Sequence, residues 1–453
     1  MIEMTLGQAA DILGSKTDHI IHPVTFRGIS IDTRTLQPGN LFVAIKGDNR
    51  DGHDFIEEAK QKGAAAALVS HQTTTTIPQL QVKDTTQALG QLSAAWRHQF
   101  HIPFVAVTGS NGKTTVKNMI TSIMTAACQG DTHQVLSTQG TLNNQWGLPL
   151  TLARLNAQHR YADIEMGMNH FGEIEYLTQL THPDIAVITN AAACHLEGVG
   201  NIQGVARAKA EIFAGLAADG IAILNRDDAF FSFWREIIGK RHYLSFGFHP
   251  DAHIRATIGE SSETEQQIVL QTPQGDQLIT LHLLGKHNVM NALAAAATGI
   301  ALNMPLEAIK IGLESLSPAP GRLTLHTLNN GVKIIDDTYN ANPFSLQAAI
   351  NTLAAFTGKR ILVLGDMREL GEEAKALHYS AGESIRQAGI DFLFTFGDLS
   401  ENTAHAFGEG AYHFNEQDKL INALKPFLYN QTTILIKGSR SMHMEKVVTE
   451  LVQ

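Results

Sequence analysis

The sequence predicts an α/β protein of three domains, and three observations support this prediction. The chain has 453 residues, more than one hydrophobic core usually holds. Short apolar runs alternate with stretches of helical periodicity, as in doubly wound α/β folds. A segment ending in Gly-Lys-Thr-Thr, Gly109–Thr115, stands between an apolar run and a helical stretch. We expect a small N-terminal α/β domain (1–85), a central P-loop ATPase-like α/β domain with a mostly parallel sheet (86–312) and a C-terminal Rossmann-like α/β domain (313–453).

The N-terminal region contains short strand-like runs such as Leu41–Ile45 and Ala65–Val69. Turn-rich pieces, DTRTLQPGN and KGDNRDGHD, lie around them. Short strands separated by turns predict a small α/β module in this part of the chain.

The central region begins with a strand, a loop and a helix. Phe104–Val107 is a short apolar run, Gly109–Gly112 is a loop, and a helix follows. The apolar residues of that helix fall on one face, at Val116, Met119, Ile120, Ile123, Met124 and Ala127. We expect two further buried strands and a hairpin in this domain, at Asp163–Met166, Asp184–Thr189, and Ile268–Leu270 with Leu278–Leu283.

A Pro/Gly break, SPAPGR at 317–322, predicts a linker before the third domain. Apolar runs then alternate with helical stretches, which predicts a second, smaller doubly wound sheet. Its expected strands are Val332–Ile335, Ile361–Leu364, Phe392–Phe396 and Thr433–Ile436.

The composition restricts the classes of function. A formal net charge of −10 argues against broad binding to nucleic acid, which needs a basic face. Two cysteines are too few for a disulfide framework and fit a reducing compartment. The first residues lack the pattern of a secretory signal, and the Ala-rich run after Asn291 fits a buried helix better than a membrane span. We therefore expect a cytoplasmic monomer without stable membrane insertion.

The run VAVTGSNGKTT is the strongest local signal. Backbone amides at the start of the helix, together with Lys113, can hold phosphate oxygens, and the Thr114 hydroxyl can bind Mg²⁺. The common spacing G-x-x-x-x-G-K-T would require Gly at 107, where this chain has Val107. The pattern is therefore a variant phosphate loop, with candidate ATP-binding residues Gly109, Ser110, Asn111, Gly112, Lys113, Thr114 and Thr115.

A lysine interrupts the apolar stripe of a helix expected around 203–216. Lys209 lies among Val205, Ala208, Ile212, Phe213 and Leu216. One interpretation is that its aliphatic stem packs while the amine reaches water. The other is that desolvation lowers the lysine pKa, so that the neutral amine adds CO₂ and becomes a carbamate ligand for Mg²⁺.

Other metal-binding side chains follow predicted strands. Glu165 ends one strand, and His195 and Glu197 lie just after another. Each alone is more often structural. Because α/β sites assemble at the carboxyl ends of strands, these side chains together with the phosphate loop favour a Mg²⁺ site.

These motifs resemble those of the Mur ligases of peptidoglycan precursor synthesis, over essentially the whole chain. TGSNGKTT resembles the ATP loop of that family, and EMG and HLEG resemble the segments that bear its Mg²⁺ ligands, which implies that role for Glu165 and His195. RAKAE places Lys209 where the family carries a carbamylated lysine. The resemblance implies catalytic roles for Lys113, His195 and Lys209, and two Mg²⁺ sites held by Thr114, Glu165, His195 and Lys209. GKHNVMN, PGR and DDTYNANP imply further ATP contacts from His287, Asn288, Asn291, Arg322 and Asp337.

Four motifs are most similar to the branch of the family that adds D-alanyl-D-alanine: SIDTR with FVAIKG, DDTYNANP, LGDMRELG and KGSRSMHME. The D-N-P-R tetrapeptide expected of the branch that adds the third residue is absent; the nearest segment is NANP, 340–343. The resemblance implies a nucleotide-peptide substrate, UDP-N-acetylmuramoyl-tripeptide, whose uridine diphosphate end contacts Ser30, Thr33, Arg34, Lys46 and Gly47. It also implies that Asn143 and Asn144 face the muramoyl-peptide and that Asn340 and Asn342 face the incoming dipeptide.

The implied activity is ATP-dependent amide formation through an acyl phosphate, supplying the pentapeptide precursor needed for cell wall growth, cell shape and cell division. The shared ATP loop leaves another Mur ligase or a folylpolyglutamate-type ligase as alternatives. A P-loop ATPase of a different class and a non-catalytic nucleotide-binding regulator also remain open.

Overall fold

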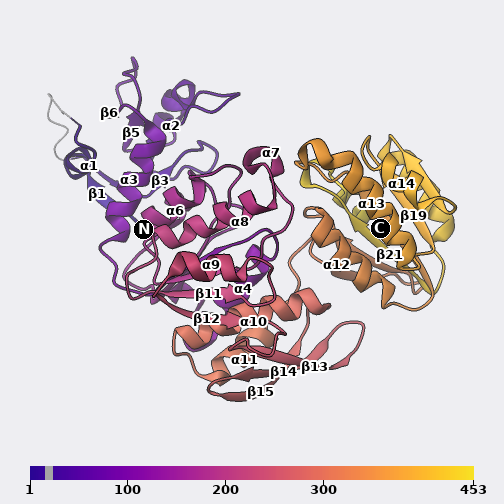
Figure 1. Ribbon diagram of the computed structural model, residues 1–453. Coiled ribbons are helices and arrows are strands. Elements are labelled where there is room, and N and C mark those ends of the chain that lie inside the picture. Colours follow the sequence, from indigo (N-terminus) through magenta and orange to yellow (C-terminus); the bar gives the residue numbers. More distant parts are fainter. Residues whose placement is uncertain (16–23, 453) are drawn as a thin grey trace.

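The computed structural model describes residues 1–15 and 24–452 and confirms an α/β protein of three domains (Figure 1). The indigo N-terminal part and the yellow C-terminal part lie on opposite sides of the magenta-to-salmon central part. Each part has its own sheet, and helices pack on those sheets.

The N-terminal domain is built on a four-stranded parallel sheet in the order β3-β4-β5-β6. Strands β4 and β5 confirm the predicted runs, whereas the antiparallel β1–β2 pair was not predicted, because three-residue strands carry little periodicity. Leu41, Val43 and Leu68 form the core of the sheet together with Leu89 and Leu92 of α3. The elements are β1 (Glu3–Thr5), α1 (Leu6–Leu13), β2 (Thr25–Arg27), β3 (Ile29–Ser30), β4 (Leu41–Val43), α2 (Ile56–Gln61), β5 (Ala66–Val69), β6 (Gln79–Gln81) and α3 (Thr85–Arg97).

The central sheet has six parallel strands in the order β12-β11-β10-β7-β9-β8. The carboxyl ends of β7, β9, β10 and β11 therefore meet at one edge, where the phosphate loop, Glu165 and His195 lie. The elements are β7 (Phe104–Thr108), α4 (Lys113–Ala127), β8 (Val135–Ser137), α5 (Gly147–Leu152), β9 (Tyr161–Glu165), α6 (Glu173–Thr181), β10 (Ile185–Ile188), α7 (Leu196–Val199), α8 (Ile202–Ala210), β11 (Ile221–Asn225), α9 (Phe231–Ile238) and β12 (His242–Phe246).

Helix α10 (Lys286–Ala301) packs with α4 in a core on one face of this sheet, and Ala292–Ala297 are all fully buried. The Ala-rich run is thus a buried helix. No helix in the described part of the chain combines the length and apolar character that a bilayer crossing requires.

The predicted hairpin is larger than expected. It is a three-stranded antiparallel sheet of β13 (Arg255–Ser261), β14 (Gln266–Thr272) and β15 (Gly275–Leu281), and α11 (Leu306–Glu314) contacts β15. Strand β13 was missed because most of its residues are exposed and polar, so it lacks the alternating pattern of a half-buried strand.

The helix expected around 203–216 is shorter in the structure. Helix α8 ends at Ala210, and Glu211–Ala214 form a 3₁₀ turn. The Glu211 carboxylate accepts the backbone N–H groups of Gly172 and Glu175, and the Thr178 hydroxyl donates to the Ile212 carbonyl, so this turn is tied to α6.

The C-terminal sheet runs in the order β16-β17-β21-β18-β19-β20, with only the edge strand β16 antiparallel. The four predicted strands are confirmed, and the two short edge strands β16 and β20 were missed. The elements are β16 (Thr324–Thr327), β17 (Lys333–Asp337), α12 (Pro343–Ala354), β18 (Lys359–Gly365), α13 (Ala374–Gln387), β19 (Phe392–Phe396), α14 (Glu401–Phe407), β20 (Ala411–Phe414), α15 (Gln417–Leu424), β21 (Thr432–Lys437) and α16 (Glu445–Val452).

Candidate active site

A cavity of about 1920 Å³ lies between the carboxyl edge of the central sheet and the C-terminal domain. Asp48 brings the N-terminal domain to the same cavity. Most of the predicted site residues line it: Ser110, Asn111, Gly112, Lys113, Thr114, Thr115, Asn143, Asn144, Glu165, His195, His287, Asn288, Asn291, Arg322, Asp337, Asn340 and Asn342.

Hydrogen bonds hold the phosphate loop in place, and one of them comes from the residue that follows the neighbouring strand β10. Gly112 has φ 81° and forms the N-cap of α4, whose first residue is Lys113. The Lys113 Nζ donates to the carbonyl oxygen of Gly109 at 2.7 Å, and the Thr189 hydroxyl donates to the Asn111 carbonyl at 2.6 Å. The loop therefore presents a helix N-terminus and a lysine to the cavity, an arrangement that suits phosphate.

Replacing Gly109 by alanine is expected to destroy this loop. Gly109 has φ 147°, which L-residues avoid, and an added Cβ would overlap the Thr189 hydroxyl. We expect ATP binding, measured by calorimetry, to weaken at least about tenfold. Gly172→Ala is the control, because that glycine also has positive φ but has open space around its Cα. Equal ATP affinities in the two variants would contradict this account.

The surroundings of the Glu165 carboxylate are those of a cation ligand. It is only 2% exposed, one carboxylate oxygen accepts from the Asn143 amide at 2.8 Å, and the other is buried without a hydrogen-bond partner. A buried carboxylate oxygen that lacks a partner is costly unless a cation or donor satisfies it. Among the described residues no three His, Cys, Asp or Glu side chains group to hold a metal, so the remaining ligands would be of other kinds, such as the Thr114 hydroxyl and phosphate oxygens.

His195 follows β10 and takes up a left-handed backbone conformation with φ 52° at the start of α7. Its Nδ1 lies 2.8 Å from a carboxylate oxygen of Glu369, which belongs to the C-terminal domain. The hydrogen bond from His195 lowers the pKa of the Glu369 carboxyl. Glu369 was not among the predicted site residues.

Lys209 is fully buried, so the interpretation in which its amine reaches water is wrong. Burial, and next the positive charge of Lys113, lower its pKa to about 7. A large fraction of the amine is therefore neutral near neutral pH, which is the form that can add CO₂.

Another part of the cavity wall combines α10 with the linker to the C-terminal domain. The Asn291 amide donates to the Asn288 Oδ1 at 3.1 Å, and Asn291 lies against Gly112 of the phosphate loop. Burial lowers the pKa of His287 to about 4, so its ring is neutral. The Arg322 guanidinium donates to the Thr114 hydroxyl at 3.1 Å, which brings a cation from the end of the Pro/Gly break to the phosphate loop.

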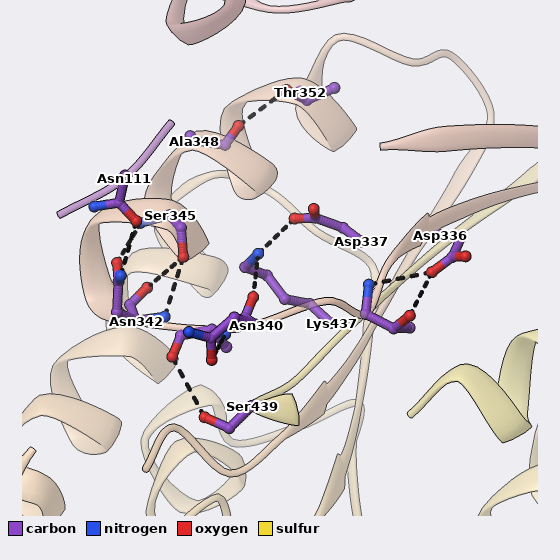
Figure 2. A network of polar contacts seen from close by, with 12 residues as sticks. Asn111, Asp336, Asp337, Asn340, Asn342, Ser345, Ala348, Thr352, Lys437 and Ser439 are labelled. Atoms are coloured by element: carbon purple, nitrogen blue, oxygen red, sulfur yellow. Dashed lines mark hydrogen bonds and ion pairs between the residues drawn. The ribbon is translucent and has the colours of Figure 1, made fainter. Parts of the chain in front are cut away.

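Figure 2 shows how the DDTYNANP segment faces the phosphate loop. Lys437 donates to Asp337 at 2.6 Å and to the Asn340 carbonyl at 3.0 Å. The Asn342 amide donates to Asn111 at 2.8 Å, while its side-chain oxygen caps α12. Of the two asparagines predicted to face the dipeptide, Asn342 therefore contacts the phosphate loop and also has a structural role, whereas Asn340 contacts Lys437.

The residues predicted to hold the uridine diphosphate end do not line the large cavity. Ser30 and Thr33 are buried, and the Arg34 guanidinium pairs with Asp32 at 2.6 Å. Lys46 and Gly47 lie in a tight turn closed by a bridge from Lys46 to Asp51. These five residues belong to the N-terminal domain, and Asp48, the residue after Gly47, is the one from this region that lines the cavity.

The structure adds residues that the sequence did not single out. Lys437 lies in KGSRSMHME and Glu369 in LGDMRELG, two motifs that were identified in the sequence. Nothing in either motif indicated that its charged side chain would reach the large cavity. Burial raises the pKa of Asp163 to about 8, and Thr121 donates to this carboxyl behind the phosphate loop. Asp163 lies two residues before Glu165 on the buried strand β9, and nothing in the sequence marked it as a site residue.

A P-loop, a buried carboxylate beside it and cations contributed by a third domain together define an ATP-dependent ligase. Three family models match the chain: "Mur ligase family, catalytic domain" over residues 25–97, "Mur ligase middle domain" over 107–299, and "Mur ligase, glutamate ligase domain" over 321–440. The chain belongs to the Mur ligase family.

Individual relatives match over the full length. The chain is 44% identical to UDP-N-acetylmuramoyl-tripeptide--D-alanyl-D-alanine ligase of Escherichia coli (strain K12), covering 100% of this chain and 99% of that protein. The solved structure of MurF from Acinetobacter baumannii is 34% identical with a TM-score of 0.93, covering 100% of this chain and 99% of that one. MurF of Thermotoga maritima in complex with ADP is 27% identical with a TM-score of 0.84, covering 94% of this chain and 96% of that one.

Proposed function

We propose that this protein joins D-alanyl-D-alanine to UDP-N-acetylmuramoyl-tripeptide and converts ATP to ADP and phosphate, giving the pentapeptide precursor of peptidoglycan. The observation that carries the proposal is the full-length likeness to the Escherichia coli ligase of that name. The proposal places the reaction in the cytoplasm, where ATP and UDP-linked precursors are available, and assigns it to a monomer.

The reaction has two steps. The terminal carboxylate of the tripeptide attacks the γ-phosphorus of ATP, which forms an acyl phosphate and releases ADP. The free amine of the dipeptide then attacks the acyl carbon, the tetrahedral intermediate expels phosphate, and the amine loses a proton to solvent.

The main obstacle is repulsion between a carboxylate and a triphosphate, so catalysis depends on positive charge and positioning. Lys113 supplies charge from the loop, and Arg322 and Lys437 supply it from the C-terminal side. Thr114 and Glu165 would hold one Mg²⁺, and His195 with Lys209 would hold a second. Bound Mg²⁺ supplies further charge to screen the phosphates.

Lys209 would take part as a carbamate. Its neutral amine forms a C–N bond to CO₂ and releases one proton, and the product presents two oxygens that share one negative charge. Complete burial and the low lysine pKa support this assignment, as does its place in RAKAE. An unmodified ammonium here would face the charge of Lys113 with little solvent screening.

Different domains would bind different parts of the substrates. Ser30, Thr33, Arg34, Lys46 and Gly47 would hold the uridine diphosphate. Asn143 and Asn144 would face the muramoyl-peptide, and Asn340 and Asn342 the dipeptide. The large cavity supports this division, because the four asparagines line it and Asp48, the residue after Gly47, reaches it from the N-terminal domain.

Acceptor choice tests the proposal against the alternatives. ADP release is measured with UDP-N-acetylmuramoyl-tripeptide and either D-alanyl-D-alanine, single amino acids or glutamate. We expect D-alanyl-D-alanine to be used at least about tenfold better than any other acceptor. A single amino acid that works where the dipeptide fails would favour another Mur ligase or a folylpolyglutamate-type ligase. ATP hydrolysis without any acceptor would favour an ATPase of a different class, and ATP binding without Mg²⁺-dependent turnover would favour a non-catalytic regulator.

A further inference from the structure

The loop that follows β18 is held rigidly at the edge of the C-terminal domain facing α7 (Figure 1). Asp366 begins it, is fully buried, and accepts the backbone N–H groups of Leu399 and Ser400 at 3.1 and 2.8 Å. Met367 and Leu370 are also buried. Three of the five residues from Asp366 to Leu370 therefore anchor the loop in its own domain.

The KGSRSMHME motif fixes the same loop from the other side. The Ser439 hydroxyl accepts the backbone N–H of Arg368 at 2.8 Å, and the Ser439 N–H donates to the Asp366 carbonyl at 3.0 Å. Glu369 then takes up a left-handed conformation with φ 64°, between the anchored residues. Residues of two motifs, LGDMRELG and KGSRSMHME, thus present a single carboxylate.

That carboxylate reaches across to the central domain. Its oxygen lies 2.8 Å from the Nδ1 of His195, and both side chains line the large cavity. A Cβ on the nearby Gly371 would lie 3.7 Å from the Glu197 side chain, so the loop and α7 are in van der Waals range. The Glu369 side chain is 59% exposed and that of His195 24%, and a polar contact this exposed contributes little to stability.

The geometry of the pair determines which ring nitrogen of His195 is available. When Nδ1–H donates to the carboxylate, the neutral ring carries its lone pair on Nε2. Histidines that bind metals are commonly held in this way by a carboxylate, which fixes both the tautomer and the ring orientation.

We propose that Glu369 is a positioning residue, through which the C-terminal domain fixes the His195 imidazole for the ligation reaction. The inference rests on the proposed function. Glu369 acts through His195 and not by touching the nucleotide.

A double-mutant cycle tests this proposal. The kcat and KM of amide formation are measured for the wild type, Glu369→Ala, His195→Ala and the double variant. We expect Glu369→Ala to lower kcat about 10- to 100-fold with the KM for ATP unchanged within about twofold. Glu369→Gln should keep part of the activity, because its amide oxygen can still accept from Nδ1–H. Glu372→Ala, an exposed carboxylate three residues further along, is the matched control and should behave as the wild type.

The decisive result is the absence of any further loss in the double variant. If Glu369 acts through His195, the double variant has the kcat of His195→Ala. A second readout is Mn²⁺ binding in the presence of ADP, followed by electron paramagnetic resonance. We expect His195→Ala to lose one set of Mn²⁺ sites. In Glu369→Ala the affinity of that same set for Mn²⁺ should fall about tenfold.

Multiplicative losses in the double variant, or a Glu369→Ala variant indistinguishable from Glu372→Ala, would overturn the inference. A wild-type enzyme that forms no amide would instead overturn the proposed function, so the two failures are distinguishable.

Discussion

Replacing Lys113 by alanine is expected to lower the kcat of amide formation about 100- to 1000-fold. Lys113 is the first residue of α4 and presents its ammonium to the cavity from the phosphate loop. In the reaction it would neutralise negative charge that moves between the γ-phosphate and the attacking carboxylate, and no other side chain of the loop carries positive charge. The measurement is steady-state ADP release with saturating substrates.

Two controls separate this effect from misfolding and from overall charge. Lys240→Ala removes an exposed positive charge from the same domain and should leave kcat unchanged. Lys113→Arg keeps the charge but changes its shape, and we expect it to recover only part of the activity. A folded Lys113→Ala variant with wild-type kcat would show that the loop does not act on the transferred phosphate.

The second large effect is expected at Lys209. Lys209→Ala should lose about 100-fold or more in kcat, because it removes the amine that becomes the anionic ligand. Alanine also leaves space in a fully buried position. A small carboxylic acid can occupy this space and present the two oxygens of the missing carbamate, so acetate or formate should restore part of the activity. The measurement is ADP release as a function of added acid.

Lys209→Met provides the matched control. Methionine fills most of the space but carries no carboxylate, so this variant should be inactive and should not respond to acetate or formate. Full activity of Lys209→Ala without added acid would refute the carbamate. Equal responses of the alanine and methionine variants to acid would show that the rescue does not take place at this position.

The parts of the fold predicted from the sequence are those with long periodic or fully buried elements. Helix α4 and strands β7, β9 and β10 were predicted because their apolar residues form one face or one continuous run. The elements missed were short or exposed. Strand β13 has five exposed residues in seven, so it shows no alternation. The end of α8 was misplaced because Glu211 bonds to α6, a contact that local periodicity cannot reveal.

The candidate site divides in the same way. The residues of the phosphate loop and Glu165 could be predicted as site residues because, in the sequence, each lies at the end of a predicted strand and close to a glycine. Glu369 and Lys437 lie more than 170 residues after His195, and only domain packing brings their charges to the cavity. A sequence pattern can mark such residues as parts of motifs, but it cannot identify which side chain they meet.

In the proposed reaction, divalent cations bring the anionic reactants together beside the phosphate loop. The most direct test is mass-spectrometric detection of the amide product from UDP-N-acetylmuramoyl-tripeptide, ATP and D-alanyl-D-alanine, before and after chelation with EDTA. We predict one amide formed for each ADP released, no product after chelation, and full recovery when excess Mg²⁺ is returned. Undiminished product in the presence of the chelator would contradict the account.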